Sequence, residues 1–203
     1  ETGRMAKQAD GAVFVTYEGC AVLATAVAAD SPREGVDFFP LTVQYQEKQF
    51  AAGKIPGGFF RREGRPGDRE ILGCRLIDRP LRPLFPKGFR NDVQIICNVY
   101  SADQINETDI LALNGASASL TISRVPFEGP VGAVRIGQVD GQFVVNPTSE
   151  QIATGTLNMV VAGTADAILM VEAGSLEVSE EVVVQALLLG QDEIKKLVEL
   201  QLK

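Results

Sequence analysis

The stretch Gly53-Lys-Ile-Pro-Gly-Gly-Phe-Phe-Arg-Arg-Glu-Gly-Arg-Pro66 separates strand-like sequence before it from helix-like sequence after it. It shows neither the alternation of a strand nor the spacing of a helix, and glycines and prolines flank its centre, so we predict a loop. Two adjacent aromatic residues, Phe59 and Phe60, precede two adjacent arginines, Arg61 and Arg62. Exposed aromatic rings are unfavourable in water unless something covers them, so this loop is a candidate binding surface.

The residue types in the loop suit single-stranded nucleic acid. Bases stack on flat aromatic faces, and phosphates pair with guanidinium groups. The alternative is that one phenylalanine fills the local core and the arginines are only solvated. Short motifs match by chance often enough that the sequence leaves both interpretations open.

Positive charge is concentrated around this loop, although the whole chain carries a net charge of −7. Between Lys48 and Arg90, eleven lysines and arginines stand against four acidic residues, whereas the rest of the chain has 8 basic and 22 acidic residues. A basic segment in an acidic chain indicates a local contact with a polyanion and argues against a general nucleic-acid coat protein. Alternatively, salt bridges to the acidic part use these residues, above all Arg69, Lys87 and Arg90.

Composition limits the class of protein. With 203 residues and 45% hydrophobic content the chain can bury a core, and no apolar run is long enough to cross a bilayer. The opening residues do not resemble a signal peptide. Three separated cysteines, Cys20, Cys74 and Cys97, are expected to be buried free thiols in a reducing compartment, which predicts a cytoplasmic protein. Histidine is absent, which excludes Ser-His and Cys-His nucleophiles, and no metal-ligand spacing is present.

Hydrophobic patterns predict an α+β domain of mixed β-sheets packed with α-helices. Turn signals at Glu18-Gly19 and Asp140-Gly141 each predict a hairpin. Strands are expected at residues 12–17, 20–29, 38–45, 92–100, 131–136, 142–145, 158–162 and 167–172. Helices are expected from an Asp68 cap to about Pro80, from a Thr108 or Asn106 cap to about Ser123, and from Ser179 to the end. No linker divides the chain, so residues 1–203 are predicted to form one domain.

Two of these helices have faces of special composition. In the first, the spacing of Arg75, Arg79 and Arg82 places the three on one face. In the second, small residues between Ala112 and Ser119 allow the helix to pack close to a sheet.

Several segments together resemble the first core domain of the bacterial polynucleotide phosphorylase family, a ribonuclease PH-like domain. The segment Gly57–Pro66 and the segment Arg75-Leu-Ile-Asp-Arg-Pro-Leu-Arg-Pro-Leu-Phe-Pro86 are highly specific in combination, and the resemblance covers essentially the whole chain. The other matching segments are Glu1–Arg4, Asp37–Val43, Val145–Thr148, Val161–Thr164 and Leu169–Glu172. Full chains of the family continue with a helical linker, a second ribonuclease PH-like copy, and KH and OB-fold domains. This sequence therefore resembles a fragment whose last helix leads toward the linker.

The resemblance implies an exoribonuclease and nucleotidyltransferase of mRNA degradation. The family shortens RNA from its 3′ end by attack of inorganic phosphate, and a divalent metal, Mg²⁺ or Mn²⁺, stabilises the developing charge. The implied assembly is a homotrimer whose core copies form a pseudo-hexameric ring around an RNA channel, with other RNA-degradation proteins as candidate partners and no membrane association.

This chain departs from the pattern of the family's catalytic copies. Those copies have a phosphate-binding donor at a helix start and two aspartates six residues apart. Here the matching helix start carries Asp109, whose charge repels phosphate, and the aspartate positions hold Ile152 and Asn158, a poor donor set for a hard cation. We therefore expect no catalytic residue, metal or cofactor in this copy, with phosphorolysis performed by the second copy.

The first copy would then supply ring scaffold and the RNA-gripping loop. The predicted RNA-binding residues are Phe59, Phe60, Arg61, Arg62 and Arg79. Three alternatives stay open: a ring scaffold without RNA contact, a complete ribonuclease PH-like exoribonuclease, and a degenerate cleft that binds an anionic metabolite. The complete exoribonuclease is disfavoured because the phosphate and metal residues are missing.

Overall fold

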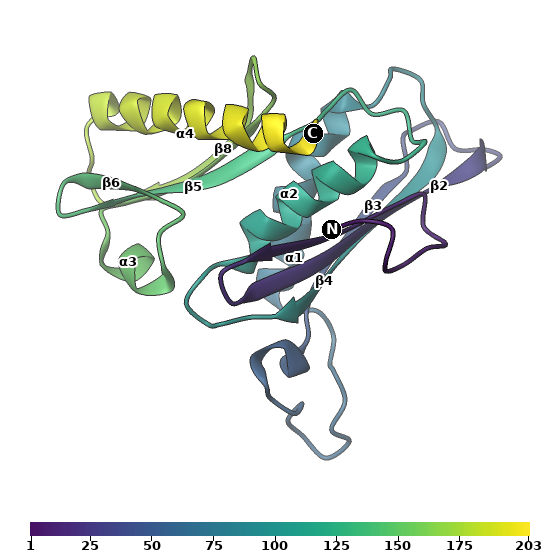
Figure 1. Cartoon of the computed structure of the whole chain (residues 1–203), viewed down its shortest axis with the longest axis horizontal. Coiled ribbons are helices and arrows are strands. Elements are labelled where there is room, and N and C mark those ends of the chain that lie inside the picture. The colour runs from purple at the N-terminus through teal and green to yellow at the C-terminus, as the bar shows by residue number, and fades with distance from the viewer.

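The computed structural model describes residues 1–203 and contains two four-stranded sheets with helices between them and on one outer face (Figure 1). The strands are β1 (Gly11–Tyr17), β2 (Cys20–Pro32), β3 (Leu41–Glu47), β4 (Asn91–Ser101), β5 (Gly132–Val139), β6 (Gln142–Val145), β7 (Leu157–Gly163) and β8 (Ile168–Ser175). The helices are α1 (Asp68–Leu81), α2 (Thr108–Thr121), α3 (Ser149–Thr154) and α4 (Glu180–Gln201), with 3-10 helices η1 (Gln49–Ala52) and η2 (Arg82–Leu84). The predicted α+β fold is confirmed.

Both hairpins form where the turn signals predict them. β1 and β2 pair antiparallel across Glu18-Gly19, with Glu18 in the left-handed region, and β5 and β6 pair antiparallel across Asp140-Gly141. The first sheet has the order β1-β2-β4-β3 and is mixed, because β3 runs parallel to β4. The second sheet has the order β6-β5-β7-β8 and is antiparallel throughout.

The period-two alternation of β7 divides the hydrophobic core into two parts. Val160 and Ala162 belong to the larger cluster, which also contains the buried faces of the first sheet, α1 and α2. Met159 and Val161 point the other way and join the smaller cluster with α4. The second sheet is therefore buried on both faces, with α1 and α2 between the sheets and α4 outside (Figure 1).

Small residues let α2 approach the first sheet closely, as predicted. A Cβ atom at Gly115 would lie 3.1 Å from Val15 of β1 and 3.1 Å from Ala24 of β2, which leaves no room for a larger side chain. This close packing fixes the position of α2 on β1 and β2.

The helices in the structure differ from the predicted ones in five respects. The N-cap of α1 is Gly67 instead of Asp68, and the N-cap of α2 is Glu107, one residue before Thr108. Pro80 lies inside α1, which ends one residue later and continues as η2. η1 and α3 are not predicted, although Thr148 and Gln151 form a capping box at the start of α3.

The three cysteines are free thiols, as expected. Cys20 and Cys97 are buried, and burial raises the pKa of the Cys97 thiol to about 12. Cys74 is only partly buried. No helix combines the length and the apolar composition that crossing a membrane requires.

Candidate nucleic-acid interface

The loop from Lys48 to Pro66 joins the end of β3 to the start of α1 and projects away from both sheets (Figure 1). Two residues near its tip, Gly58 and Arg61, have left-handed backbone with φ of 82° and 47°. These conformations turn the chain back on itself. The predicted loop is therefore present, with the Phe-Phe-Arg-Arg motif at its far end.

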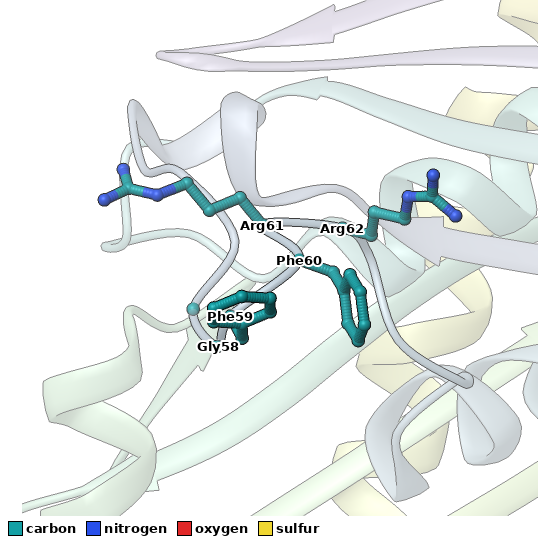
Figure 2. Close-up of a pocket in the computed structure, with 6 residues that line it drawn as sticks. Gly58, Phe59, Phe60, Arg61 and Arg62 are labelled. Carbon is teal, nitrogen blue, oxygen red and sulfur yellow. The ribbon is translucent and has the colours of Figure 1, made fainter.

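Both aromatic rings of the loop are exposed to solvent. Phe59 is 95% exposed and Phe60 78% exposed, and the ring centroids lie 5.3 Å apart with the planes at 86°. The tip residues from Gly57 to Arg62 line an open hollow of about 310 Å³, in which Figure 2 shows both rings on one side of the chain. Neither ring fills the core, so the alternative that one phenylalanine is a core residue is wrong.

The two arginines at the tip are free. Arg61 and Arg62 are exposed and make no side-chain hydrogen bond or ion pair, in contrast to Arg69 and Arg82 of α1 and η2. Figure 2 shows the two arginine side chains pointing away from each other, with Arg61 to the left of the two aromatic rings and Arg62 to their right. Two unpaired cations on either side of two exposed rings can meet phosphates on both sides of a stacked base.

Arg79 does not join the loop tip. It lies on α1, and its Nη1 atom is 3.2 Å from Oε2 of Glu172 in β8. Its side chain keeps about half of its surface exposed, and its assignment as an RNA contact stays a prediction.

Arg82 has a structural role. Its guanidinium donates to both carboxylate oxygens of Asp78 at 2.7 and 2.9 Å and to the carbonyl oxygens of Phe39 and Leu41. The expected salt bridge of Arg69 is present, with Glu47 and Glu107 as partners. For Lys87 and Arg90 the alternative of salt bridges is not supported, because neither residue is paired with an acidic side chain.

Two of the residues that the sequence resemblance assigns to the degenerate catalytic site, Asp109 and Asn158, share a contact with Arg135. The Nη2 atom of Arg135 in β5 lies 2.6 Å from Oδ2 of Asp109, and its Nη1 atom donates to Oδ1 of Asn158 at 2.9 Å. Asp109 and Arg135 are only 18% and 12% exposed. The carboxylate at the start of α2 is thus neutralised by an internal cation. Ile152 lies apart from these contacts, on α3.

Two residues of this region are missed by the sequence patterns. Arg135 stands in a strand whose neighbours Val134 and Ile136 are buried, and a charged residue in such a strand signals a buried partner. Glu70 is the third residue of α1 and accepts from the backbone N–H of Gly67, which is one half of a capping box, since the N-cap glycine has no side chain to complete it.

Family models match the chain in two parts. The model described as "3′ exoribonuclease family, domain 1" matches residues 1–126, and that described as "3′ exoribonuclease family, domain 2" matches residues 129–193. The boundary falls between α2 and β5, before the second sheet begins. A solved structure of rice Rrp46 has a TM-score of 0.75 at 14% identity and covers 100% of this chain and 93% of its own. At that identity the likeness concerns the fold, and it confirms the predicted ribonuclease PH-like architecture.

Curated relatives are much closer in sequence. The polyribonucleotide nucleotidyltransferase of Thermomicrobium roseum is 60% identical over 203 residues, which is 100% of this chain and 26% of that protein. The protein of the same name from Rhodospirillum centenum is 57% identical over 98% of this chain and 28% of its own length. These relatives confirm the resemblance to the polynucleotide phosphorylase family, and the chain spans about a quarter of their length. Since the domain 1 model alone matches more than half of the residues, the chain belongs to the 3′ exoribonuclease family.

Proposed function

We propose that this chain is the non-catalytic first core domain of a phosphorolytic 3′-to-5′ exoribonuclease, and that its Phe59–Arg62 loop grips single-stranded RNA. The observation that carries the proposal is the loop tip, where two exposed rings lie beside two arginines without partners. The relatives' name, polyribonucleotide nucleotidyltransferase, supports a polynucleotide as the substrate class.

The loop chemistry favours RNA threading without sequence preference. Stacking uses the face that every base has, and a guanidinium–phosphate pair does not depend on the base. An enzyme that removes nucleotides one after another needs such a grip, since each step presents a new sequence to the same residues. Arg79, about half exposed on α1, would be a secondary contact that exchanges Glu172 for a phosphate.

Phosphorolysis would take place in another copy of the fold. Within this chain Asp109 is held by Arg135, and Asn158 stands where a metal carboxylate would be needed. Inorganic phosphate and Mg²⁺ or Mn²⁺ would act at the second core copy, with no catalytic or metal-binding residue supplied here.

The chain would also contribute half of a ring. We propose a homotrimer of full-length chains in which first and second copies alternate around an RNA channel. The full protein would work in the cytoplasm, where other RNA-degrading proteins are its candidate partners. Support comes from family membership and from apolar side chains left exposed on α4 and β8.

The proposal is tested by RNA affinity and thermal stability measured side by side. Phe60→Ala and Arg61→Ala/Arg62→Ala should each weaken binding of a labelled single-stranded RNA, with melting temperatures close to that of the unmodified chain. Lys7→Ala, which removes an exposed charge far along the chain from the loop, is the matched control. Unchanged RNA affinity in both loop variants would instead favour a ring scaffold without RNA contact.

A further inference from the structure

The tip of the loop has no contacts of its own that fix its position. Phe59 to Arg62 make no side-chain hydrogen bond or ion pair, and the only backbone bond among them runs from Arg61 N–H to the Gly58 carbonyl. A grip needs its rings and cations held in place, because ordering a loose loop upon binding reduces affinity. The positioning must therefore come from the two limbs and the base of the loop.

The outgoing limb is attached to the body of the protein. Ala51 of η1 accepts a hydrogen bond from the N–H of Ala102, the residue after β4, and Lys54 Nζ donates to Oε1 of Gln104 at 3.1 Å. These contacts hold the limb that leaves β3.

The returning limb, from Arg61 to Pro66, has one attachment along its length. Its residues are all exposed, and within it only the Glu63 carboxylate bonds outward, accepting from Gln49 N–H at 2.8 Å. The limb then reaches Gly67, the N-cap of α1.

One carboxylate closes the base of the loop. Oε1 of Glu70 accepts from the backbone N–H of Glu47 at 3.0 Å, and Oε2 accepts from the backbone N–H of Gly67 at 2.8 Å. Glu47 is the last residue of β3 and Gly67 the residue before α1, so the two amides flank the loop on either side. Hydrogen bonds to a charged acceptor are stronger than those to a neutral one. Loss of the Glu70 carboxylate would leave both backbone N–H groups without this partner.

The base is in turn attached to α2. Arg69 pairs with Glu47 at 3.1 Å and with Glu107, the N-cap of α2. Glu47 also accepts from Tyr45 Oη at 2.5 Å, and burial together with this carboxylate raises the pKa of Tyr45.

We propose that Glu70 is the positioning residue of the RNA-gripping loop. By accepting from the backbone N–H of Glu47 at the end of β3 and from that of Gly67 at the N-cap of α1, it sets the direction in which Phe59–Arg62 project. The inference rests on the proposed function of the loop and adds a residue that does not touch RNA. The positioning role and simple electrostatics predict opposite changes in RNA affinity when Glu70 is replaced. Glu70 is an acid beside a basic RNA site, so losing its charge alone should strengthen RNA binding.

The experiment compares three variants of the whole chain, residues 1–203, with a labelled single-stranded RNA. Glu70→Gln removes the charge and points an amide donor at one of the two N–H groups. Glu70→Asp keeps the charge but is one methylene too short to reach both. Asp68→Asn is the control, because it removes an exposed charge in the same helical turn without any side-chain contact.

We expect RNA affinity to fall about three- to tenfold in Glu70→Gln and in Glu70→Asp, and to stay equal or rise in Asp68→Asn. Hydrogen exchange should speed up at Glu47, Gly67 and the loop, while the β4 amides stay protected. A merely structural role would lower the melting temperature without this local pattern.

Two outcomes separate this inference from the function on which it rests. If both Glu70 variants bind RNA as tightly as Asp68→Asn does, the positioning role is overturned even when Arg61→Ala/Arg62→Ala abolishes binding. If the arginine variant binds as well as the unmodified chain, the RNA grip itself fails. Should Glu70→Gln not fold, Glu70→Asp decides alone, since no charge changes.

Discussion

Asp109 and Arg135 form an ion pair with an oxygen–nitrogen distance of 2.6 Å, between the first turn of α2 and the middle of β5. The pair joins the helix layer to the second sheet, and Asp109 is the residue that the family resemblance matches to the phosphate-binding helix start of catalytic copies. Its two members lie far apart in the sequence, and Asn158 from a third element completes it.

Removing one member of this pair should destabilise the fold. Arg135→Ala leaves the Asp109 carboxylate nearly buried without a cation, which costs about 3 kcal/mol of unfolding free energy in comparable buried pairs. Arg33→Ala, which breaks the exposed pair with Asp92, should cost under about 1 kcal/mol. Chemical denaturation measures both. Equal losses in the two variants would show that Arg135 is not a structural cation.

The chain alone should not release nucleoside diphosphates. Incubation of an RNA 3′ end with phosphate and Mg²⁺ is expected to give no product, because Asp109 and Asn158 are both committed to Arg135. Robust turnover that Asp109→Ala abolishes would refute the assignment of this site as inactive.

Replacing an aromatic residue of the loop and replacing an arginine should change the salt dependence of RNA affinity differently. Phe59→Ala should lose about 1–3 kcal/mol of RNA binding with an unchanged slope of affinity against salt, since stacking releases no counterion. Arg62→Ala should lower the slope by about 0.7 per phosphate contact. Fluorescence anisotropy over a salt series measures both. A slope that changes equally in the two variants would contradict the division of roles.

The isolated chain should self-associate. Leu188 and Val184 are 63% and 54% exposed and lie four residues apart, so they form an apolar patch on one face of α4 that self-association would cover. Leu188→Glu should reduce the apparent mass in light scattering, whereas Gln185→Glu, an exposed neighbour, should not. A monodisperse monomer at high concentration in the unmodified chain would count against this expectation.

Acid should weaken the turn between β4 and α2. Burial alone would raise the pKa of Asp103, but the backbone N–H groups of Asn106 and Ile105 bond its carboxylate and lower the pKa below its ordinary value of 3.8. The folded pKa is depressed, so the stabilisation is complete above pH 3.8 and disappears as pH falls further. Asp103→Ala should lower the melting temperature at pH 7, and this difference should shrink in acid. A difference that does not vary with pH would show that these hydrogen bonds do not stabilise the fold.

The local elements were determined largely by the sequence itself. Turn pairs at Glu18-Gly19 and Asp140-Gly141 require backbone that few residues adopt, and strand alternation follows from which face is buried. The Gly- and Pro-flanked Phe59–Arg62 segment cannot form a regular element, so its loop conformation was also predictable. The short helix α3 was missed, although its capping box at Thr148 is a readable signal.

Only the tertiary structure decided which charges meet. The spacing of Arg79 and Arg82 predicts a shared helix face. In the structure, however, Arg82 pairs with Asp78 and donates to the carbonyl oxygen of Phe39, while Arg79 pairs with Glu172 in the second sheet. Side chains of equal type and similar exposure differ because their partners come from distant parts of the chain. The same holds at the loop, where the sequence supplies the rings and cations of the tip. The packing of β3 against α1 brings the backbone N–H groups of Glu47 and Gly67 within reach of the Glu70 carboxylate, and such contacts between distant parts of the chain depend on the completed fold.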